Sequence, residues 1–307
     1  MSSLVADSTS DVQIFEYSRA VNPIASGSVP EIPYREFSAA LYASGESRIV
    51  PLDLSAELRC PYPATTPGLL ASFVRIHAGE RLATSPRATG EFYYVIRGRG
   101  RTETAGGAIP WKTGDFFILP GIPAEHHADD DAAFYLVTDS PLLAYLGVER
   151  SEARFRPTLY SREAVMRELE NAKADPHASQ RSRISVLLAN RNFEQTMTIT
   201  HVLWTMFGII PPGARQMPHR HQSAAVDYVV EAGPNVYTLV GAALNPDGTI
   251  QNPVRADWHT GSAFVTPPGY WHEHRNESGA DAFIMPIQDA GLHTYLRTLD
   301  IQFYSKH

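Results

Sequence analysis

The chain of 307 residues is 43% hydrophobic and 19% charged, a globular composition with enough material for two compact domains. A formal net charge of -7 and the lack of any clustered Lys/Arg run argue against a nucleic-acid partner, so we expect a small-molecule ligand. No apolar stretch approaches the roughly 18 to 20 residues that cross a bilayer, which argues against a membrane partner. Because Cys60 is the only cysteine and the N-terminus lacks a secretion signal, we expect no intrachain disulfide and a cytoplasmic location.

The first half of the chain divides into an arm and a barrel. Residues 1–50 mix short apolar runs with prolines and are predicted to form an N-terminal arm. Residues 51–150 contain alternating runs such as SFVRI, EFYYVIRGRGRT and DFFILP, separated by glycine and proline turns. This pattern predicts the short antiparallel strands of a β-barrel.

The first barrel carries two segments whose Gly, Glu and Pro positions repeat the pattern of segments in the second half. They are GERLATSPRATGE from residue 79 and GDFFILPGIPAEHH from residue 114. In this alignment Ser85 and Arg87 occupy the positions of a His-x-His pair, and Glu125 falls where a third histidine would lie. An arginine beside the site repels a cation, so we expect this barrel to be metal-free.

Residues 151–190 are predicted to link the halves through a short helix. The segment SREAVMRELENAKADPHAS begins with a serine N-cap, has apolar residues at helical spacing and ends before Pro176.

The second half, residues 191–307, holds the strongest functional signal. His219 and His221 are two residues apart, so on a strand they point to the same side. The segment PPGYWHEH from residue 267 reverses the chain and places His272 at the start of the returning strand, with His274 on the same face. Three neutral imidazoles, from His219, His221 and His272, can then meet at one divalent metal with open positions.

Both segments resemble the two signature motifs of the cupin superfamily of small jelly-roll barrels. The resemblance implies an all-β chain of two tandem cupin barrels (double-stranded β-helices), with the N-terminal arm and the helical linker added. Cupins usually have a glutamate separated from the His-x-His pair by three or four residues, at the positions where this chain has Ala225 and Val226. The implied site therefore has three histidines and no carboxylate.

The chain looks most similar to the gentisate, salicylate and 1-hydroxy-2-naphthoate 1,2-dioxygenases, which are Fe(II) bicupins. The similarity rests on VLWTMFGIIPPG leading into PHRHQSAA, on PPGYWHEH and on TLDIQF in the second half, and on IPWKTGDFFILP and DSPLLAYLGVER in the first. Two features depart from the family. The metal-binding barrel comes second here, and Asp227 stands where the family has an arginine for the substrate carboxylate.

Other candidate site residues follow from this resemblance and from strand alternation. Trp204 matches a family tryptophan that lines the site, and Arg215 and Met217 share the side of His219 if its strand extends that far back. Arg215 could then replace the missing anion clamp. Asp227 and His274 are further catalytic candidates, and Tyr228 and Trp271 are expected to contact substrate.

These observations predict an iron-dependent dioxygenase that acts on an aromatic or other oxygen-chelating small molecule together with dioxygen. One alternative uses Zn, Mn or Ni on the same histidines for hydrolysis, isomerisation or lyase chemistry, with Asp227, Tyr228 or Glu231 as acid or base. A second alternative is a bicupin that binds a small molecule without catalysis. Exposed strand edges and the arm favour a homodimer or homotetramer.

Overall fold

The computed structural model describes residues 10–178, 181 and 183–304, and the chain forms two compact units, Met1–Glu31 and Ile32–His307. The described part of the first unit is exposed and contains one 3-10 helix, η1 (Tyr17–Arg19), whose N-cap Glu16 accepts a hydrogen bond from the Ser18 N–H. The second unit holds all the other elements and is the one described below. Among the described residues, no helix is long and apolar enough to span a membrane.

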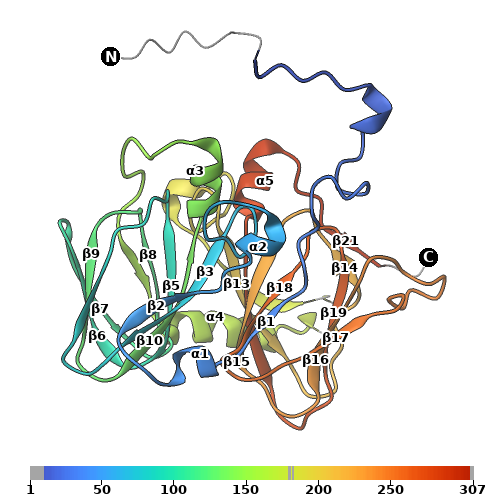
Figure 1. The fold of residues 1–307 in the computed structure, drawn as a ribbon. Coiled ribbons are helices and arrows are strands. Elements are labelled where there is room, and N and C mark those ends of the chain that lie inside the picture. The colour runs from blue at the N-terminus through green and yellow to red at the C-terminus, as the bar shows by residue number, and fades with distance from the viewer. Residues whose placement is uncertain (1–9, 179–180, 182, 305–307) are drawn as a thin grey trace. The chain divides into compact units, whose positions relative to one another are not determined.

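The second unit is mostly β-structure, as predicted, and its elements run in chain order through two barrels (Figure 1). Those up to α3 are β1 (Glu36–Phe37), α1 (Ala40–Ala43), β2 (Arg48–Pro51), α2 (Ser55–Leu58), β3 (Leu70–Ile76), β4 (Arg81–Thr84), β5 (Glu91–Arg97), β6 (Arg99–Thr104), β7 (Gly107–Lys112), β8 (Phe116–Leu119), β9 (Ala124–Ala128), β10 (Ala132–Thr138) and α3 (Ser140–Leu146). Those that follow are β11 (Thr158–Tyr160), α4 (Arg162–Ala174), β12 (Ile184–Leu188), η3 (Arg191–Phe193), β13 (Trp204–Ile210), β14 (His219–Arg220), β15 (Ala225–Glu231), β16 (Val236–Gly241), β17 (Val254–Asp257), β18 (Ala263–Thr266), β19 (Trp271–Asn276), β20 (Ala282–Gln288), α5 (Ala290–Leu296) and β21 (Gln302–Phe303).

Each barrel consists of two antiparallel sheets. In the N-terminal barrel the strand orders are β11-β8-β5-β10-β3-β2 and β4-β9-β6-β7. In the C-terminal barrel they are β1-β18-β15-β20-β13-β12 and β17-β16-β19-β14-β21. The two tandem jelly-roll barrels that the sequence predicts are therefore present.

The segments outside the two predicted barrels contribute strands to both of them. Within the predicted arm, β1 pairs with β18 of the C-terminal barrel, whereas β2 pairs with β3 of the N-terminal barrel. Within the predicted linker, α4 is the expected helix, and the Ser161 hydroxyl caps it by accepting a hydrogen bond from the Ala164 N–H. The same stretch supplies β11 to the first barrel and β12 to the second. These short strands cover sheet edges that would otherwise be unpaired.

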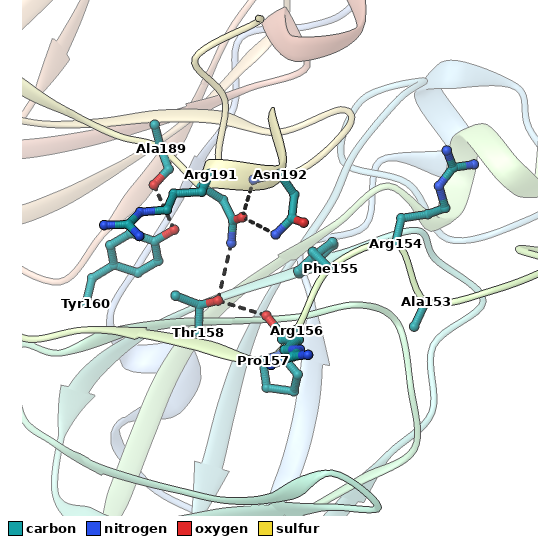
Figure 2. A pocket seen from close by; sticks show the side chains of 11 residues that line it. Ala153, Arg154, Phe155, Arg156, Pro157, Thr158, Tyr160, Ala189, Arg191 and Asn192 are labelled. Atoms are coloured by element: carbon teal, nitrogen blue, oxygen red, sulfur yellow. Dashed lines mark hydrogen bonds between the residues drawn. The ribbon is translucent and has the colours of Figure 1, made fainter. Parts of the chain in front are cut away.

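The two ends of the linker also contact each other directly (Figure 2). The Asn190 side-chain amide donates a hydrogen bond to the Thr158 hydroxyl at 3.2 Å. The Tyr160 hydroxyl donates to the carbonyl of Ala189 at 3.0 Å. Because these bonds join the segment before α4 to the segment after β12, they hold the entry and exit of the linker together.

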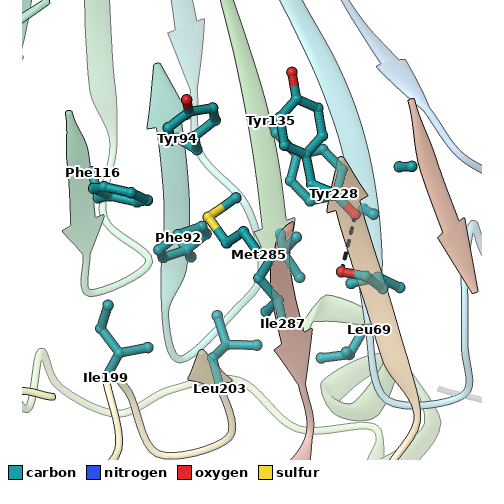
Figure 3. Packing of buried hydrophobic residues seen from close by; sticks show 14 of the residues in the cluster. Leu69, Phe92, Tyr94, Phe116, Tyr135, Ile199, Leu203, Tyr228, Met285 and Ile287 are labelled. Carbon is teal, nitrogen blue, oxygen red and sulfur yellow. Dashed lines mark hydrogen bonds between the residues drawn. The ribbon is translucent and has the colours of Figure 1, made fainter. Parts of the chain in front are cut away.

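The two six-stranded sheets pack face to face, which buries an aromatic core between the barrels (Figure 3). Tyr135 of β10 stacks on Tyr228 of β15 with ring centroids 4.9 Å apart, and Phe116 meets Phe207 edge-on at 5.6 Å. Alternate residues of the same strands point the other way, into the barrel interiors. Both faces of these sheets are therefore buried, and only the inward face can contribute to a site inside a barrel.

Candidate metal centre

Two adjacent strands of the C-terminal barrel bring the motif histidines together. β14 and β19 are antiparallel, and His219 lies directly opposite His272 with ring centroids 4.0 Å apart. His221 follows β14 by one residue, and its ring centroid is 5.0 Å from that of His272 and 6.4 Å from that of His219. The Gly269 N–H, in the predicted turn, donates to the His221 carbonyl at 2.7 Å, which ties the two motifs together.

A fourth imidazole belongs to the same cluster. His274 is two residues beyond His272 on the same face of β19, with its ring centroid 5.9 Å from that of His219. One ring nitrogen from each of His219, His272 and His274 lies within 4.8 Å of the others. All four histidines are buried. The three nitrogens that lie closest together therefore belong to His219, His272 and His274. The sequence predicts His221 as the third ligand in place of His274.

The hydrogen bonds of the outer ring nitrogens distinguish these four histidines. Nδ1 of His219 lies 3.1 Å from the Met217 carbonyl, and Nδ1 of His272 lies 3.1 Å from the Tyr270 carbonyl. Nδ1 of His221 lies 2.8 Å from the carbonyl of Ser223. A carbonyl only accepts, so each of these Nδ1 atoms carries the proton and leaves Nε2 as a hydrogen-bond acceptor or potential metal ligand. Such backbone anchoring is the usual support of a metal-ligating histidine.

His274 has a different partner. Its Nδ1 lies 2.7 Å from the hydroxyl of Thr238, which also accepts a hydrogen bond from Trp258 Nε1 at 2.8 Å. The threonine hydroxyl can donate to Nδ1, which would leave the proton on Nε2 of His274. In that tautomer Nε2 of His274 carries a proton that it can donate in a hydrogen bond.

Burial keeps these imidazoles neutral. It lowers the pKa of His221 to about 4 and that of His274 to about 3, and it places the pKa values of His219 and His272 well below the ordinary range. The other imidazoles and the Arg183 guanidinium add to this effect. Neutral imidazoles can accept a divalent cation at a deprotonated ring nitrogen without releasing protons at neutral pH. At His219 the cation would have to take the place of the Arg183 guanidinium, which donates to Nε2.

Arg183, which the sequence analysis missed, is a cation inside this cluster. Its Nη2 lies 2.6 Å from Nε2 of His219, and its Nη1 contacts the sulfur of Met206 on β13. Burial lowers the pKa of this guanidinium to about 10, opposed by the charge of Asp227, so it stays protonated at neutral pH. Arg183 precedes β12 and is distant from both motifs in the sequence, so no local pattern marks it.

Two more polar groups extend the cluster. Asp227 is buried and accepts a hydrogen bond from the Thr266 hydroxyl at 2.6 Å; burial raises its pKa to about 7, opposed by that hydrogen bond and by Arg183. Gln216 donates its backbone N–H to the His274 carbonyl at 2.9 Å. Its side-chain Oε1 is buried without a hydrogen-bond partner among the described residues. Arg183 and Gln216 thus add a cation and a polar amide to the predicted set.

Arg215 does not serve as the anion clamp suggested by strand alternation. The backbone of Arg215 forms an isolated antiparallel β-bridge with Arg275, the residue that follows His274 and points outward. The Nε of Arg215 donates to the buried carboxylate of Glu273 at 3.0 Å. Since His219 pairs with His272, a regular ladder would place Arg215 opposite Asn276. The pairing shifts by one residue between Arg215 and His219, and this shift moves Arg215 to the outer face.

The structure places the four residues predicted to contact substrate in different environments. Tyr228 is 1% exposed but lies in the core between the barrels, on the opposite face of β15 from Asp227. Trp271 alternates with His272 and lies on the outer face, where the Arg220 guanidinium covers its ring at 5.0 Å. The side chain of Met217 is 36% exposed, so it lies outside the buried cluster. Only Trp204, partly buried, lies on the same face of β13 as Met206.

A second group of potential ligands, Glu103, Glu125 and His127, lies on the outside of the N-terminal barrel. These carboxylates are exposed and pair with Arg101 and Arg81. These residues form a surface network of ion pairs.

Parts of the chain are similar to named proteins. No family model matches the chain. It is 38% identical over 67 residues to 5-aminosalicylate 1,2-dioxygenase of Comamonas sp, which covers 21% of this chain and 18% of that protein. It is 27% identical over 150 residues to gentisate 1,2 dioxygenase 1 of Aquipseudomonas alcaligenes, covering 49% and 40%. It is 30% identical over 108 residues to 1-hydroxy-2-naphthoate 1,2-dioxygenase of Nocardioides sp. (strain KP7), covering 35% and 24%. These matches therefore span less than half of each relative's length.

Among solved structures, a mutant of salicylate 1,2-dioxygenase from Pseudoaminobacter salicylatoxidans in complex with gentisate superposes with a TM-score of 0.73 at 15% identity. The superposition covers 95% of this chain and 92% of that one. An oxalate decarboxylase superposes with a TM-score of 0.53 at 16% identity, over 82% of this chain and 76% of that one. At these identities the likeness concerns the fold.

Two tandem jelly-roll barrels, one of them lined by clustered histidines, give this chain the two-barrel fold of the superposed dioxygenase structure. In parts of its sequence the chain is similar to gentisate and 1-hydroxy-2-naphthoate 1,2-dioxygenases, at low identity.

Proposed function

We propose that this chain is an iron(II)-dependent dioxygenase that cleaves a small aromatic acid or a related oxygen-chelating molecule, with His219, His221 and His272 as the metal ligands. The observation that carries the proposal is the anchoring of three buried, neutral imidazoles, each by its Nδ1 to a main-chain carbonyl. Imidazole nitrogen suits iron, and three ligands leave positions open for other groups. The names of the matched relatives support the choice of reaction.

The iron, when bound, would supply the redox chemistry with dioxygen, and the protein would orient the substrate in a cavity shielded from water. Arg183 provides a partly buried guanidinium beside His219, with a planar fork of donors that fits a carboxylate. This arginine offsets the loss of the family arginine at the position of Asp227. The proposed substrate is therefore an anion despite that acid.

Two groups are placed to handle protons. Nε2 of His274 would donate a hydrogen bond to a substrate or oxygen atom, with Thr238 holding the ring orientation. Asp227, whose pKa burial raises to about 7, can hold a proton near neutral pH and release it as charge changes nearby. We propose His274 and Asp227 as the acid and base groups of the site.

The proposal is tested with full-length protein purified without air. We expect about one iron per chain by elemental analysis, and oxygen uptake with at least one of gentisate, salicylate, 5-aminosalicylate and 1-hydroxy-2-naphthoate. The His219→Ala variant should lose both iron and oxygen uptake. Stoichiometric iron with no oxygen uptake across this set would reject the aromatic-acid dioxygenase.

The buried acid at Asp227 favours one second candidate, a Zn-, Mn- or Ni-dependent hydrolase, isomerase or lyase that uses this carboxyl as acid or base. Turnover that needs one of these metals and proceeds without dioxygen would establish it. A protein that binds none of these metals would instead fit a non-catalytic small-molecule binder. We also propose a homodimer or homotetramer, to be measured by light scattering.

A further inference from the structure

A large cavity lies away from the histidine cluster, at the contact between the two ends of the linker (Figure 2). Its volume is about 830 Å³, and its walls come from residues 153–160 on one side and 189–192 on the other. None of the residues that line it belongs to the candidate metal centre. A ligand bound here would therefore occupy a second, separate site.

Three arginines, Arg154, Arg156 and Arg191, line this cavity, and no carboxylate does so among the described residues. The guanidinium groups of Arg156 and Arg191 have no ion-pair partner in the described part of the chain. Arg154 approaches only the exposed Glu152, at 3.7 Å, which is beyond hydrogen-bonding distance. Concentrated positive charge without compensation, in a chain of net charge -7, favours an anionic ligand.

The floor of the cavity is built from side chains that already satisfy one another. Asn190 Oδ1 accepts hydrogen bonds from the backbone N–H and the side-chain amide of Asn192, at 2.9 and 2.7 Å. The side-chain amide of Asn190 donates to Thr158, as described above. Because these groups bond to each other, the floor is preorganised and the arginines remain the groups available to a ligand.

The shape of the cavity bears on the kind of anion. Figure 2 shows the three arginines apart from one another, with Arg191 at the left, Arg154 at the right and Arg156 below the centre of the view. Arginine binds carboxylate and phosphate oxygens in pairs through its planar fork. Guanidinium groups that are set apart in this way, as those of Arg191 and Arg156 are, fit a molecule that carries an oxyanion group at each end.

We propose that this cavity is a binding site for a small molecule with two separated oxyanion groups, either a dicarboxylate or a phosphate compound. Arg156 and Arg191 hold the oxyanions, and Arg154 adds to the positive field. Binding at this site does not require a metal, so it can be tested independently of the proposed dioxygenase activity.

Isothermal titration calorimetry on the full chain tests the proposal, with succinate, pyrophosphate and the monoanion benzoate as probes. We expect succinate or pyrophosphate to bind more tightly than benzoate, and the better of the two identifies the ligand class. The Arg156→Ala/Arg191→Ala variant should weaken that binding by roughly tenfold or more, because charge-assisted hydrogen bonds are lost. Arg48→Ala, which removes an exposed arginine on β2, is the matched control and should leave it unchanged.

The His272→Ala variant separates this cavity from the metal centre. Binding that persists in His272→Ala and weakens in the arginine variant assigns the anion to the cavity. Binding lost in His272→Ala and retained in the arginine variant would overturn the proposal, as would no detectable binding of either dianion. Circular dichroism of each variant, matching that of the parent chain, confirms that the comparison is made on folded protein.

Discussion

The two barrels share one internal framework but use it differently. A tryptophan indole donates to a threonine hydroxyl, which contacts Nδ1 of a histidine on the neighbouring strand; the chains are Trp258, Thr238 and His274 in the C-terminal barrel, and Trp111, Thr102 and His126 in the N-terminal one. The strand pairing that aligns threonine with histidine is also the same. The framework therefore accompanies the metal-site geometry without being sufficient for it.

The two barrels differ in the residues at the predicted ligand positions. The pair His219 and His272 corresponds in strand register to Thr84 and Ala124. The sequence alignment expects Ser85 and Glu125 at these positions, one residue later in each strand. Both of those residues alternate with the inward ones and so point outward, which is why spacing alone misassigned them.

Packing also fills the interior of the N-terminal barrel. Tyr93, in the register position of Asp227, stacks on Phe117 with centroids 4.5 Å apart and nearly parallel rings. Trp111 and Phe134 meet edge-on at 4.8 Å in the same interior. Aromatic rings thus fill the space that polar groups line in the other barrel. In this chain, the barrel that lacks histidines at the predicted ligand positions is also the one whose interior is filled by aromatic rings.

The largest expected effect tests which three imidazoles bind metal. His221→Ala should weaken iron binding by more than about 100-fold, since even residues that only support ligands cost 10- to 100-fold. His274→Ala should keep the iron and weaken substrate binding instead. Elemental analysis and substrate titration measure the two outcomes.

Thr84→Ala, at the matching position of the N-terminal barrel, is the control and should leave the iron content unchanged. Iron retained in His221→Ala and lost in His274→Ala would reassign the ligand set to the three nitrogens that lie closest together.

The next effect concerns the packed interior of the N-terminal barrel. Phe134 is fully buried among aromatic rings, so Phe134→Ala should reduce the free energy of unfolding by about 3 to 5 kcal/mol. Urea denaturation measures this loss, and Leu159→Ala, at a partly exposed position of β11, should cost less than about 1 kcal/mol. A loss at Phe134 no larger than that of the control would mean that this interior is not tightly packed.

The shared framework gives a smaller, paired effect. Thr102→Val and Thr238→Val each leave buried indole and imidazole groups without a partner, at a cost of about 1 to 3 kcal/mol in unfolding free energy. Only Thr238→Val should also reduce oxygen uptake, because only its histidine faces the proposed metal. Equal activity losses in both variants would argue against a role for His274 in the reaction.

The last effect is a change of stability with pH, in which each pH unit contributes little. Burial raises the pKa of Glu91 to about 8, so the folded chain keeps a proton that the unfolded chain releases near its ordinary pKa of 4.5. This carboxyl therefore lowers stability progressively as pH rises from about 4.5 to 8, by at most about 1.4 kcal/mol per pH unit. Glu91→Gln should remove that decline in urea denaturation series, whereas the exposed Glu46→Gln should not.

Much of the architecture could be predicted because it depends on local patterns. Strand alternation, glycine and proline turns and the Ser161 cap identified the barrels and the α4 helix. The spacing of His219, His221 and His272 brings them together because alternation and one turn fix their directions within short stretches of chain.

Other features were decided by contacts between distant segments. Arg183 reaches His219 only because β12 and β13 pair in one sheet, and a one-residue shift of pairing turned Arg215 outward. Tyr228 faces away from the site because the N-terminal barrel packs on that side of β15. Sequence determined which residues alternate, but only the tertiary structure decided which face is inside, since that depends on what packs against each sheet.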